Sequence, residues 1–238
     1  MMKPVGEIKE GAYFTEKQMN NWEEKEMEKY RDKFEHKFYS QNNEEFFIVN
    51  YLNGFIGTFL DIGANLITSN TQRLAELGWS GVCVDASPIA YQKLVEHYKG
   101  NDKVRCLNCA VMPKTERVKF WDSNGDGIST TSEKQMNEWK QNPNVDYKEI
   151  EVMGFSVSDF FSKAGYDFDF ISIDVEGINW EIFSRLPFEK LNNLKMICVE
   201  HAGMCDLMTK KINQYGFKEI KQARNPENMI FVLNREEI

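Results

Sequence analysis

The amino-acid sequence predicts an α/β protein in which helices cover both faces of a mostly parallel sheet. The first observation is that short apolar runs, typical of buried strands, alternate along the chain with amphipathic helical segments. The second is residues 58–88, which have the order strand, glycine turn, helix and strand. The third is that three buried runs lead into acidic residues, at Asp61, Asp85 and Asp174. Because parallel strands end at one edge of a sheet, we expect a ligand site there.

The composition sets bounds on the architecture and on the partners. The 238 residues carry a net charge of −8, and 42% of them are hydrophobic. This length suffices for one well-cored domain with extensions, or for two small domains at most. The acidity argues against a nucleic-acid partner, which needs an extended basic face. No apolar run approaches the ~18 residues of a membrane span, and residues 1–4 do not open a signal peptide, so we expect a cytoplasmic protein.

The cysteines agree with that expectation. Their number is odd, and several lie inside strand-like runs, which indicates reduced thiols of the core; they are Cys83, Cys106, Cys109, Cys198 and Cys205. Cys106 and Cys109 form a CxxC pattern. In an extended run these two side chains point to opposite faces, so we predict neither a redox pair nor a zinc site.

The first 39 residues are expected to form a helical extension, and residues 40–238 the main domain. The segment 15–39 is dense in Glu and Lys, with apolar residues every three to five positions: Met19, Trp22, Met27, Tyr30, Phe34 and Phe38. This spacing predicts an amphipathic helix. We expect its stripe to pack on the core, although it is also suited to roofing a cleft or to forming a homo-oligomer. A short helix over 44–52 then leads into the first strand.

Residues 58–88 contain the first candidate site. Phe59 and Leu60 begin a strand that turns sharply at 61–65, and a helix capped by Thr68, Ser69 or Asn70 follows. Gly78 ends that helix, and a second buried strand runs over 82–84 to Asp85. An acidic residue about 20 positions after a glycine turn is suited to holding a ribose.

The charge of the turn selects the class of cofactor. A dinucleotide site needs several glycines under its pyrophosphate, but only Gly63 is present, and Asp61 beside it would repel a phosphate. A carboxylate there favours a cationic cofactor, and S-adenosylmethionine carries an ammonium and a sulfonium. Asp85 would accept hydrogen bonds from the ribose hydroxyls. The alternatives are an NAD(P)-binding oxidoreductase and a non-catalytic or calcium-binding module with the same fold.

The next elements extend the same sheet. Ser87 and Pro88 open a helix that runs through Lys99, and a third strand is expected over 104–110. Asn108, Cys109 and Ala110 fall at the carboxyl end of that strand, where they would flank an adenine.

A strand over 118–121 then opens an insertion at about 122–144. Its residues Asp122, Asn124, Asp126, Gly127 and Glu133 match the calcium-loop pattern D-x-[DN]-x-[DN]-G-x5-E. An EF-hand needs a helix on both sides, whereas 118–121 is strand-like. We therefore favour a polar, substrate-facing loop that caps a helix over 132–140.

The second candidate site follows a strand over 147–153, a helix from Ser156 to Lys163, and a buried strand over 168–173. That strand leads into Asp174 and Glu176, which alternation places on one side. After a helix over 179–186, a strand over 195–199 leads into Glu200 and His201. Four ionisable groups thus arrive at the ends of two strands expected to be neighbours, which indicates a functional site. A helix over 205–215 and strands over 217–221 and 228–233 complete the chain.

With S-adenosylmethionine as the cofactor, the chemistry expected there is methyl transfer. Alignment of the acceptor is the main requirement, and a hydroxyl acceptor would also need a base or a bound metal to take its proton. Glu176 or His201 would be the base. Alternatively, Asp174, Glu176 and Glu200 would hold a divalent ion, and we favour the metal-free route.

Six motifs resemble one known family, the FkbM-type S-adenosylmethionine-dependent methyltransferases. They are YSQNNEEF, FLDIGAN followed by SNT, GVCVDASP, NCAV, DFISIDVEG and ICVEH, in order over residues 39–233. The resemblance implies a class I methyltransferase fold, Rossmann-like and with a seven-stranded sheet. It assigns Asp61, Gly63 and Asn65 to the cofactor turn, Asp85 with the adjoining Ala86 to the ribose, and Asp174 and Glu176 to the acidic pair beside the transferred methyl.

The resemblance also implies the acceptor class. Similar family members methylate hydroxyls, typically of sugars or polyketide-like natural products, so the expected partner is a small molecule or a glycan. Two departures from the family pattern stand out. The segment between Asn65 and Ser69 is short and lacks an Asp-Gly, and Asn179 stands where the family often has Glu.

Overall fold

The computed structural model describes residues 39–52 and 54–234. The helix expected over 15–39, and with it the proposed extension, lies outside these residues except for Tyr39. Within the described ranges, no helix combines the length and the apolar character needed to cross a membrane.

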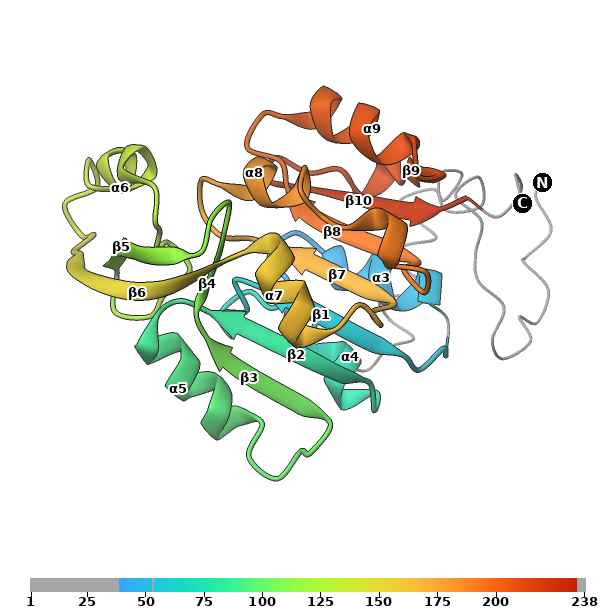
Figure 1. Cartoon of the computed structure of the whole chain (residues 1–238), viewed down its shortest axis with the longest axis horizontal. Coiled ribbons are helices and arrows are strands. Elements are labelled where there is room, and N and C mark those ends of the chain that lie inside the picture. Colours follow the sequence, from blue (N-terminus) through green and yellow to red (C-terminus); the bar gives the residue numbers. More distant parts are fainter. Residues whose placement is uncertain (1–38, 53, 235–238) are drawn as a thin grey trace.

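The main sheet has seven strands in the order β3-β2-β1-β7-β8-β10-β9 (Figure 1). Their bounds are β1 Thr58–Ile62, β2 Ser80–Asp85, β3 Val104–Asn108, β7 Phe170–Ile173, β8 Met196–Glu200, β9 Phe217–Glu219 and β10 Asn228–Leu233. The pairs from β3 to β8 are parallel, and β10 runs antiparallel to both of its neighbours. This arrangement confirms the mostly parallel, seven-stranded sheet that the sequence predicts.

Helices cover both faces of this sheet. One face carries α3 Glu44–Leu52, α4 Gln72–Glu76 and α5 Pro88–His97; the other carries α7 Val157–Ala164, α8 Asn179–Phe183 and α9 Cys205–Asn213. Alternation along the strands divides the core accordingly, so that Phe59 packs with the first set and Leu60 and Ile62 with the second. Short 3-10 turns follow α8 at Phe188–Lys190 and β9 at Lys221–Ala223.

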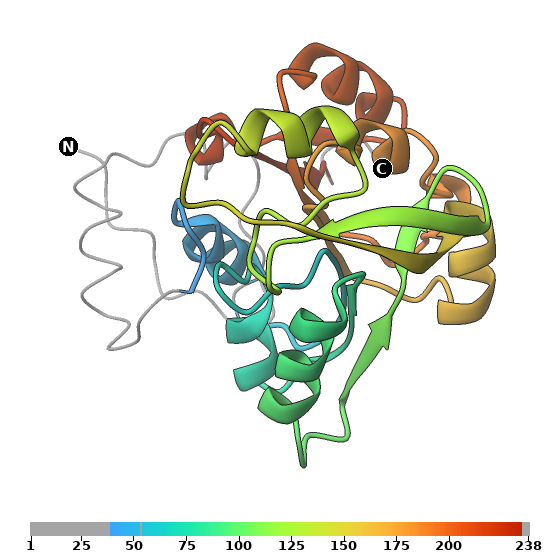
Figure 2. The same cartoon turned by 90° about the vertical axis from the view of Figure 1, so that its left-hand side faces the viewer.

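A second, three-stranded sheet lies over the carboxyl ends of the main strands (Figure 2). It has the order β4-β6-β5, with β4 Ala110–Met112, β5 Glu116–Asp122 and β6 Lys148–Ser156, and α6 Glu133–Trp139 lies between β5 and β6 in the sequence. The single strand expected over 104–110 is therefore wrong. The chain leaves the main sheet at Cys109, whose N–H donates to the carbonyl of Asp85 at 3.2 Å, and β4 then pairs with β6.

Serine hydroxyls begin the helices where the sequence predicts them. Ser87 accepts the N–H groups of Ile89 and Ala90 at 3.2 Å, and Ser132 and Ser156 make the same kind of cap for α6 and α7. At α4 the N-cap residue is Thr71, not Thr68, Ser69 or Asn70, and its side chain makes no capping bond. The hydroxyl oxygen of Ser69 still accepts the N–H of Gln72, the first residue of α4, at 3.0 Å. These caps fix where each helix begins beside the sheet edge.

One buried ion pair connects the amino ends of three central strands. The carboxylate of Asp169 accepts the N–H of Thr58 at 2.9 Å and also binds Nζ of Lys195. The side chains of Asp169 and Lys195 are 11% and 15% exposed, so little solvent screens the pair. The Lys195 ammonium additionally lies 4.7 Å from the centre of the Phe55 ring.

Replacing Asp169 with alanine should lower the free energy of unfolding by about 3 kcal/mol, because it leaves Lys195 largely buried without its carboxylate. Chemical denaturation monitored by circular dichroism would measure this change. Asp167→Ala is the matched control, since Asp167 is exposed and its removal should cost less than about 0.5 kcal/mol. Equal losses in the two variants would contradict the structural role assigned to the pair.

Candidate active site

A cleft of about 530 Å³ opens at the carboxyl ends of β1, β2 and β7. The chain passes from β1 to β2 and β3 on one side and later returns to β7 on the other side of β1, so the strand order reverses at β1. Ligands of open α/β sheets bind at such a point. The cleft is therefore the first candidate site on topological grounds, independent of any motif.

Gly63 allows the two sides of this cleft to meet. It has a φ of +86°, and a Cβ built there would lie 1.6 Å from the carbonyl oxygen of Asp174. The N–H of Asp174 in turn donates to the carbonyl of Ile62 at 2.9 Å. The glycine is thus required by the approach of another strand end, rather than only by a ligand. A substitution at Gly63 would disturb the fold as well as the cleft.

Asp85 lies at the end of β2, and one of its carboxylate oxygens is hydrogen-bonded to the backbone. Oδ1 accepts the N–H of Ser87 at 2.8 Å, and no described residue donates to Oδ2. The residue lines the cleft beside Ala86. Burial raises the pKa of Asp85 to about 7, with a further contribution from Asp122. Its second oxygen is therefore available to hydroxyl donors in the cleft.

The residues after β3 divide between the cleft wall and its support. Cys109 and Ala110 line the cleft, as predicted. Asn108 does not: its amide donates to the carbonyls of Asp85 and Ala86 at 2.9 and 3.1 Å. Asn108 therefore fixes the turn that carries Asp85, and it lines a separate cavity beside Phe155.

Asp61 closes the deep end of the site. Its Oδ2 accepts the hydroxyl of Thr71 at 2.6 Å, and the side chain borders a smaller space of about 330 Å³ together with Asn65 and Asp174. Asp61 is 3% exposed, and this burial raises its pKa to about 7, with Asp174 adding to the shift. A cationic group placed here would be stabilised by the ionised form. The Asn65 amide also donates to the carbonyl of Gly125 at 3.2 Å, which connects the turn to the insertion.

The opposite wall of the cleft is apolar and comes from the small sheet. Met112, Phe120 and Val111 line it, together with Ile178 after β7. None of these four residues is predicted for the site from the sequence. Apolar side chains occur in almost every buried strand, so they do not mark a site by themselves. These residues reach the cleft because the chain leaves the main sheet at Cys109, and no glycine or proline marks that break in the sequence. The cleft is thus apolar on one side and lined by carboxylates on the other.

Glu176 lies beside the site in an unusual backbone conformation. β7 ends at Ile173, and Glu176 has a φ of +53°, so the alternation expected beyond the strand is wrong even though Asp174 and Glu176 do line the same cleft. The hydroxyl of Thr130 donates to the carbonyl oxygen of Glu176 at 2.5 Å. This contact from the insertion holds the residue in the left-handed region, which is costly for a non-glycine residue.

The carboxylate of Glu176 is held by α6. Its Oε2 accepts the side-chain amide of Gln135 at 3.1 Å and the indole N–H of Trp139 at 3.4 Å. Burial, followed by the charge of Asp174, raises the pKa of Glu176 to about 7. A carboxylate with this pKa is suited to exchanging a proton near neutral pH.

Asp174 and Glu200 are half-buried carboxyl groups at the ends of β7 and β8. These strands are parallel neighbours, as predicted. Desolvation, followed by the charge of Asp174, raises the pKa of Glu200 to about 9. Asn179 donates to Glu200 and accepts the N–H of Val175 at 2.9 Å, which makes this amide the bridge between the two strand ends.

His201 lies outside the set of residues that line the cleft. Its Nδ1 accepts the N–H of Gly203 at 3.0 Å, and its Nε2 lies 3.2 Å from the carbonyl oxygen of Asn225. An acceptor role at Nδ1 leaves the proton on Nε2, where it is donated to that carbonyl. Both ring nitrogens are thus engaged with backbone groups.

The loop that matches the calcium pattern uses its carboxylates to hold itself together. Asp122 accepts the N–H of Gly125 at 2.8 Å and the hydroxyl of Ser87 at 3.1 Å, and Asp126 accepts the N–H of Ile128 at 3.1 Å. The element before the loop is strand β5, as expected from its sequence. Among the described residues, no group of three or more His, Cys, Asp or Glu side chains is arranged to hold a metal ion.

The raised pKa values make the stability of the protein depend on pH. Asp61, Asp85 and Glu176 stay protonated up to about pH 7 in the folded state, but in the unfolded chain they ionise near pH 4. The folded state therefore binds more protons between these values. The resulting stabilisation is complete below pH 4 and is lost as the pH rises through 7.

We expect the free energy of unfolding to fall from pH 5 to pH 7, with Asp61 alone contributing about 1 kcal/mol per pH unit. Asp61→Asn keeps the Thr71 hydrogen bond but cannot ionise, so its profile should be flatter by that amount. Urea denaturation at several pH values would measure both slopes. Asp102→Asn, at an exposed position, should retain the parent slope; an unchanged slope in Asp61→Asn would refute the assignment.

Comparison with known proteins places this geometry in a family. No curated protein matches the chain. Among solved structures, it is similar to a fibrillarin pre-rRNA processing protein of Methanococcus jannaschii, with 11% identity, a TM-score of 0.39, and coverage of 75% of this chain and 67% of that chain. It is also similar to a proposed tRNA methyltransferase of Streptococcus pneumoniae, with 13% identity, a TM-score of 0.39, and coverage of 75% and 64%.

The model of the methyltransferase FkbM domain matches residues 61–219. The match begins at Asp61 in β1 and ends at Glu219 in β9, so it includes both faces of the cleft, the small sheet and α6. It also contains the buried carboxylates and the glycine turn described above. Since the match covers well over half of the chain, the protein belongs to the FkbM methyltransferase family.

Proposed function

We propose that the protein transfers a methyl group from S-adenosylmethionine to a hydroxyl of a neutral acceptor, such as a sugar, a glycan or a natural product. The observation that carries this proposal is the polarity of the cleft. The apolar wall is followed by the carboxylate of Asp85 and then by the acidic end at Asp61 and Asp174. The adenine, the ribose and the cationic methionine part of that cofactor follow one another in the same order.

The residues present fit this cofactor. Phe120 and Met112 provide an apolar surface for a purine, and the unpartnered Oδ2 of Asp85 is available to ribose hydroxyls. A dinucleotide fits poorly, because its pyrophosphate would meet Asp61 or Asp85. The bound cofactor supplies an electrophilic methyl group. Asp61, Asn65 and Asp174 would hold its charged end.

Glu176 is the residue we assign to the acceptor proton. Its pKa of about 7 lets it remain ionised in part of the population at neutral pH and take the proton as the methyl moves. Gln135 and Trp139 act as positioning residues, because both donate to Oε2 and leave Oε1 for the acceptor. The raised pKa of Glu200 favours its neutral form, and both ring nitrogens of His201 contact backbone groups, so neither is assigned this task.

The acceptor would occupy a space of about 900 Å³ beside Glu176. Its lining includes Trp139 of α6 and Gln41 before α3, and it joins the cofactor cleft at Asp174 and Glu176. The ionisable side chains that line it are all carboxylates. An anionic acceptor would be repelled, whereas the indole and the polar groups are suited to a neutral polyhydroxylated molecule.

The remaining features support a cytoplasmic setting for the reaction. All five cysteines are free thiols, and Cys83, Cys109 and Cys198 are buried. Free core thiols fit a reducing compartment. The net charge of −8 and the acidic acceptor space also disfavour nucleic acid as the substrate.

Asp85→Ala should weaken binding of S-adenosylhomocysteine at least about tenfold, equivalent to ~1.4 kcal/mol, because the ribose loses its acceptor. Isothermal titration calorimetry on the folded variant would measure this. Asp102→Ala lies at the other end of the sheet and should bind like the parent. If NADH binds instead and S-adenosylhomocysteine does not, the proposal fails in favour of an oxidoreductase.

Glu176→Gln should lower the rate of single-turnover methyl transfer by about 10²-fold or more while cofactor affinity stays within about twofold. The amide keeps the size of the side chain but cannot accept the proton. The rate is measured with a panel of neutral sugars and glycosides once one is found to be methylated. Glu138→Gln, on the exposed side of α6, is the control. Transfer at the parent rate in Glu176→Gln would exclude it as the base.

A further inference from the structure

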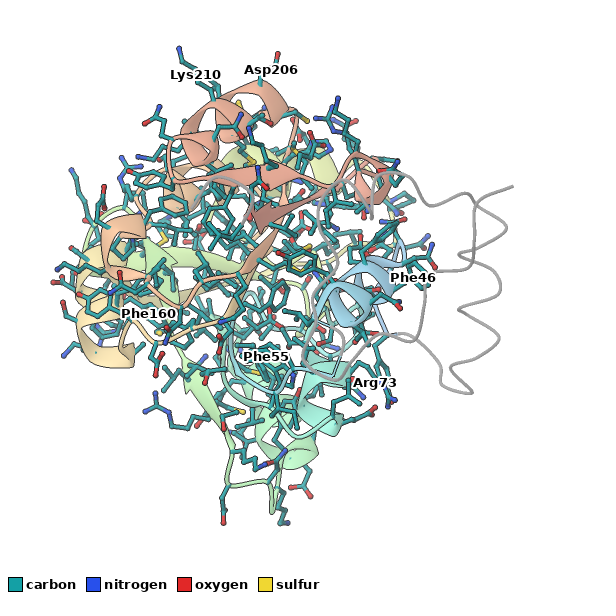
Figure 3. All side chains as sticks on the ribbon, turned by 90° about the vertical axis from the view of Figure 1, so that its right-hand side faces the viewer. Phe46, Phe55, Arg73, Phe160, Asp206 and Lys210 are labelled. Atoms are coloured by element: carbon teal, nitrogen blue, oxygen red, sulfur yellow. The ribbon has the colours of Figure 1, made fainter. Side chains whose placement is uncertain are left out.

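An apolar groove lies at the end of the sheet opposite to the cleft. It encloses about 740 Å³ near the amino ends of β1 and β2 and is formed largely by Val49, Leu52, Phe55, Ile56, Leu77 and Trp79. Figure 3 looks onto this side of the molecule, with Phe46 of α3, Phe55 of the following loop and Arg73 of α4 labelled. None of these groove residues borders the cleft or the acceptor space.

Two large apolar side chains at the rim are accessible. Ile56 is 61% exposed and Leu77 is 41% exposed, whereas Leu52 and Trp79 below them are buried. Single exposed apolar residues are ordinary, but here they flank a concave apolar space. The groove therefore has the character of a docking surface.

The chain itself contains a segment suited to this surface. Thirty-eight residues precede Tyr39, and residues 15–38 carry the apolar stripe described above. Its last members, Tyr30, Phe34 and Phe38, are spaced by four, which would place them on one face of a helix. The four residues after Asn234 are Arg, Glu, Glu and Ile, which offer a single apolar side chain.

The described part of the protein begins at Tyr39, which is hydrogen-bonded to a residue next to the groove rim. The hydroxyl of Tyr39 donates to Oε1 of Glu76 at 2.5 Å, and Glu76 directly precedes Leu77 at the rim. The N–H of Tyr39 donates to Oε2 of Glu45 in α3 at 2.5 Å. Tyr39 thus connects α3 and α4, and these two helices, with the segments that directly follow each of them, form the groove.

We propose that residues 15–38 dock into this groove of their own molecule, with Phe34 and Phe38 covering Ile56 and Leu77. Because Tyr39 fixes one end of the segment, its effective concentration at the groove is on the order of millimolar. The same segment of a second molecule would displace it only at a comparable, millimolar protein concentration. The segment would then cover the end of the sheet that takes no part in methyl transfer.

The direct test is photo-crosslinking of the full-length protein with a benzophenone analogue of phenylalanine at position 34. Equal amounts of unlabelled and nitrogen-15-labelled protein are mixed before irradiation. We expect cross-links to peptides that contain Ile56 or Leu77, with both halves of each cross-link carrying the same isotope. Cross-links of mixed isotope would assign the groove to a second copy, and cross-links to any other region would overturn the proposal.

Hydrogen exchange of the full-length protein provides an independent readout. In Phe34→Asp the amides of 49–56 and 74–79 should exchange about tenfold faster than in the parent, because the groove is uncovered. His36→Asp adds the same charge two positions away, on the opposite face of the expected helix, and should leave exchange unchanged. Ile56→Glu, at an exposed rim position, should reproduce the effect of Phe34→Asp. Equal exchange in all three variants and the parent would contradict docking.

Discussion

The approach of two backbones at the centre of the sheet is the constraint on which the rest of the site depends. Asp174 comes so close to Gly63 that no side chain fits between them, and this contact joins the turn after β1 to the turn after β7. The cofactor turn and the acidic strand end therefore form one rigid unit. A buried amide bridge from Asn179 extends that unit to β8, so three strand ends are held in register before any ligand arrives.

Desolvation of carboxylates is the second theme of the structure. Asp61, Asp85, Asp174, Glu176 and Glu200 lie around the cleft and the two spaces that adjoin it. All five have raised pKa values, with burial as the largest cause in each case. Buried carboxyl groups are stabilised either by keeping their protons or by accepting hydrogen bonds. A cationic ligand would stabilise their ionised forms directly. The same arrangement therefore supports the proposal of a positively charged ligand.

The main sheet, and the strand ends that bring Gly63, Asp85 and Asp174 to one cleft, could be predicted from the sequence because their signals are local. Buried strands, serine caps and the Gly63 turn each depend on a few neighbouring residues. The small sheet could not be predicted, since the break at Cys109 depends on pairing between β4 and β6, more than 40 positions apart. For the same reason the apolar wall at Phe120 and the donors to Glu176 from Gln135 and Trp139 were missed. Asn108 was expected at the adenine but supports the turn from behind, a distinction that strand position alone does not make.

The small sheet also bears on how members of such a family diverge. Among the described residues, its three strands pair only with one another, and it supplies the apolar wall of the cleft. The helix between β5 and β6 donates to the carboxylate of Glu176. The sequence of the small sheet can therefore change without altering the pairing of the seven main strands. Exchanging residues 110–156 between relatives is accordingly a way to change the acceptor preference while the main sheet is kept.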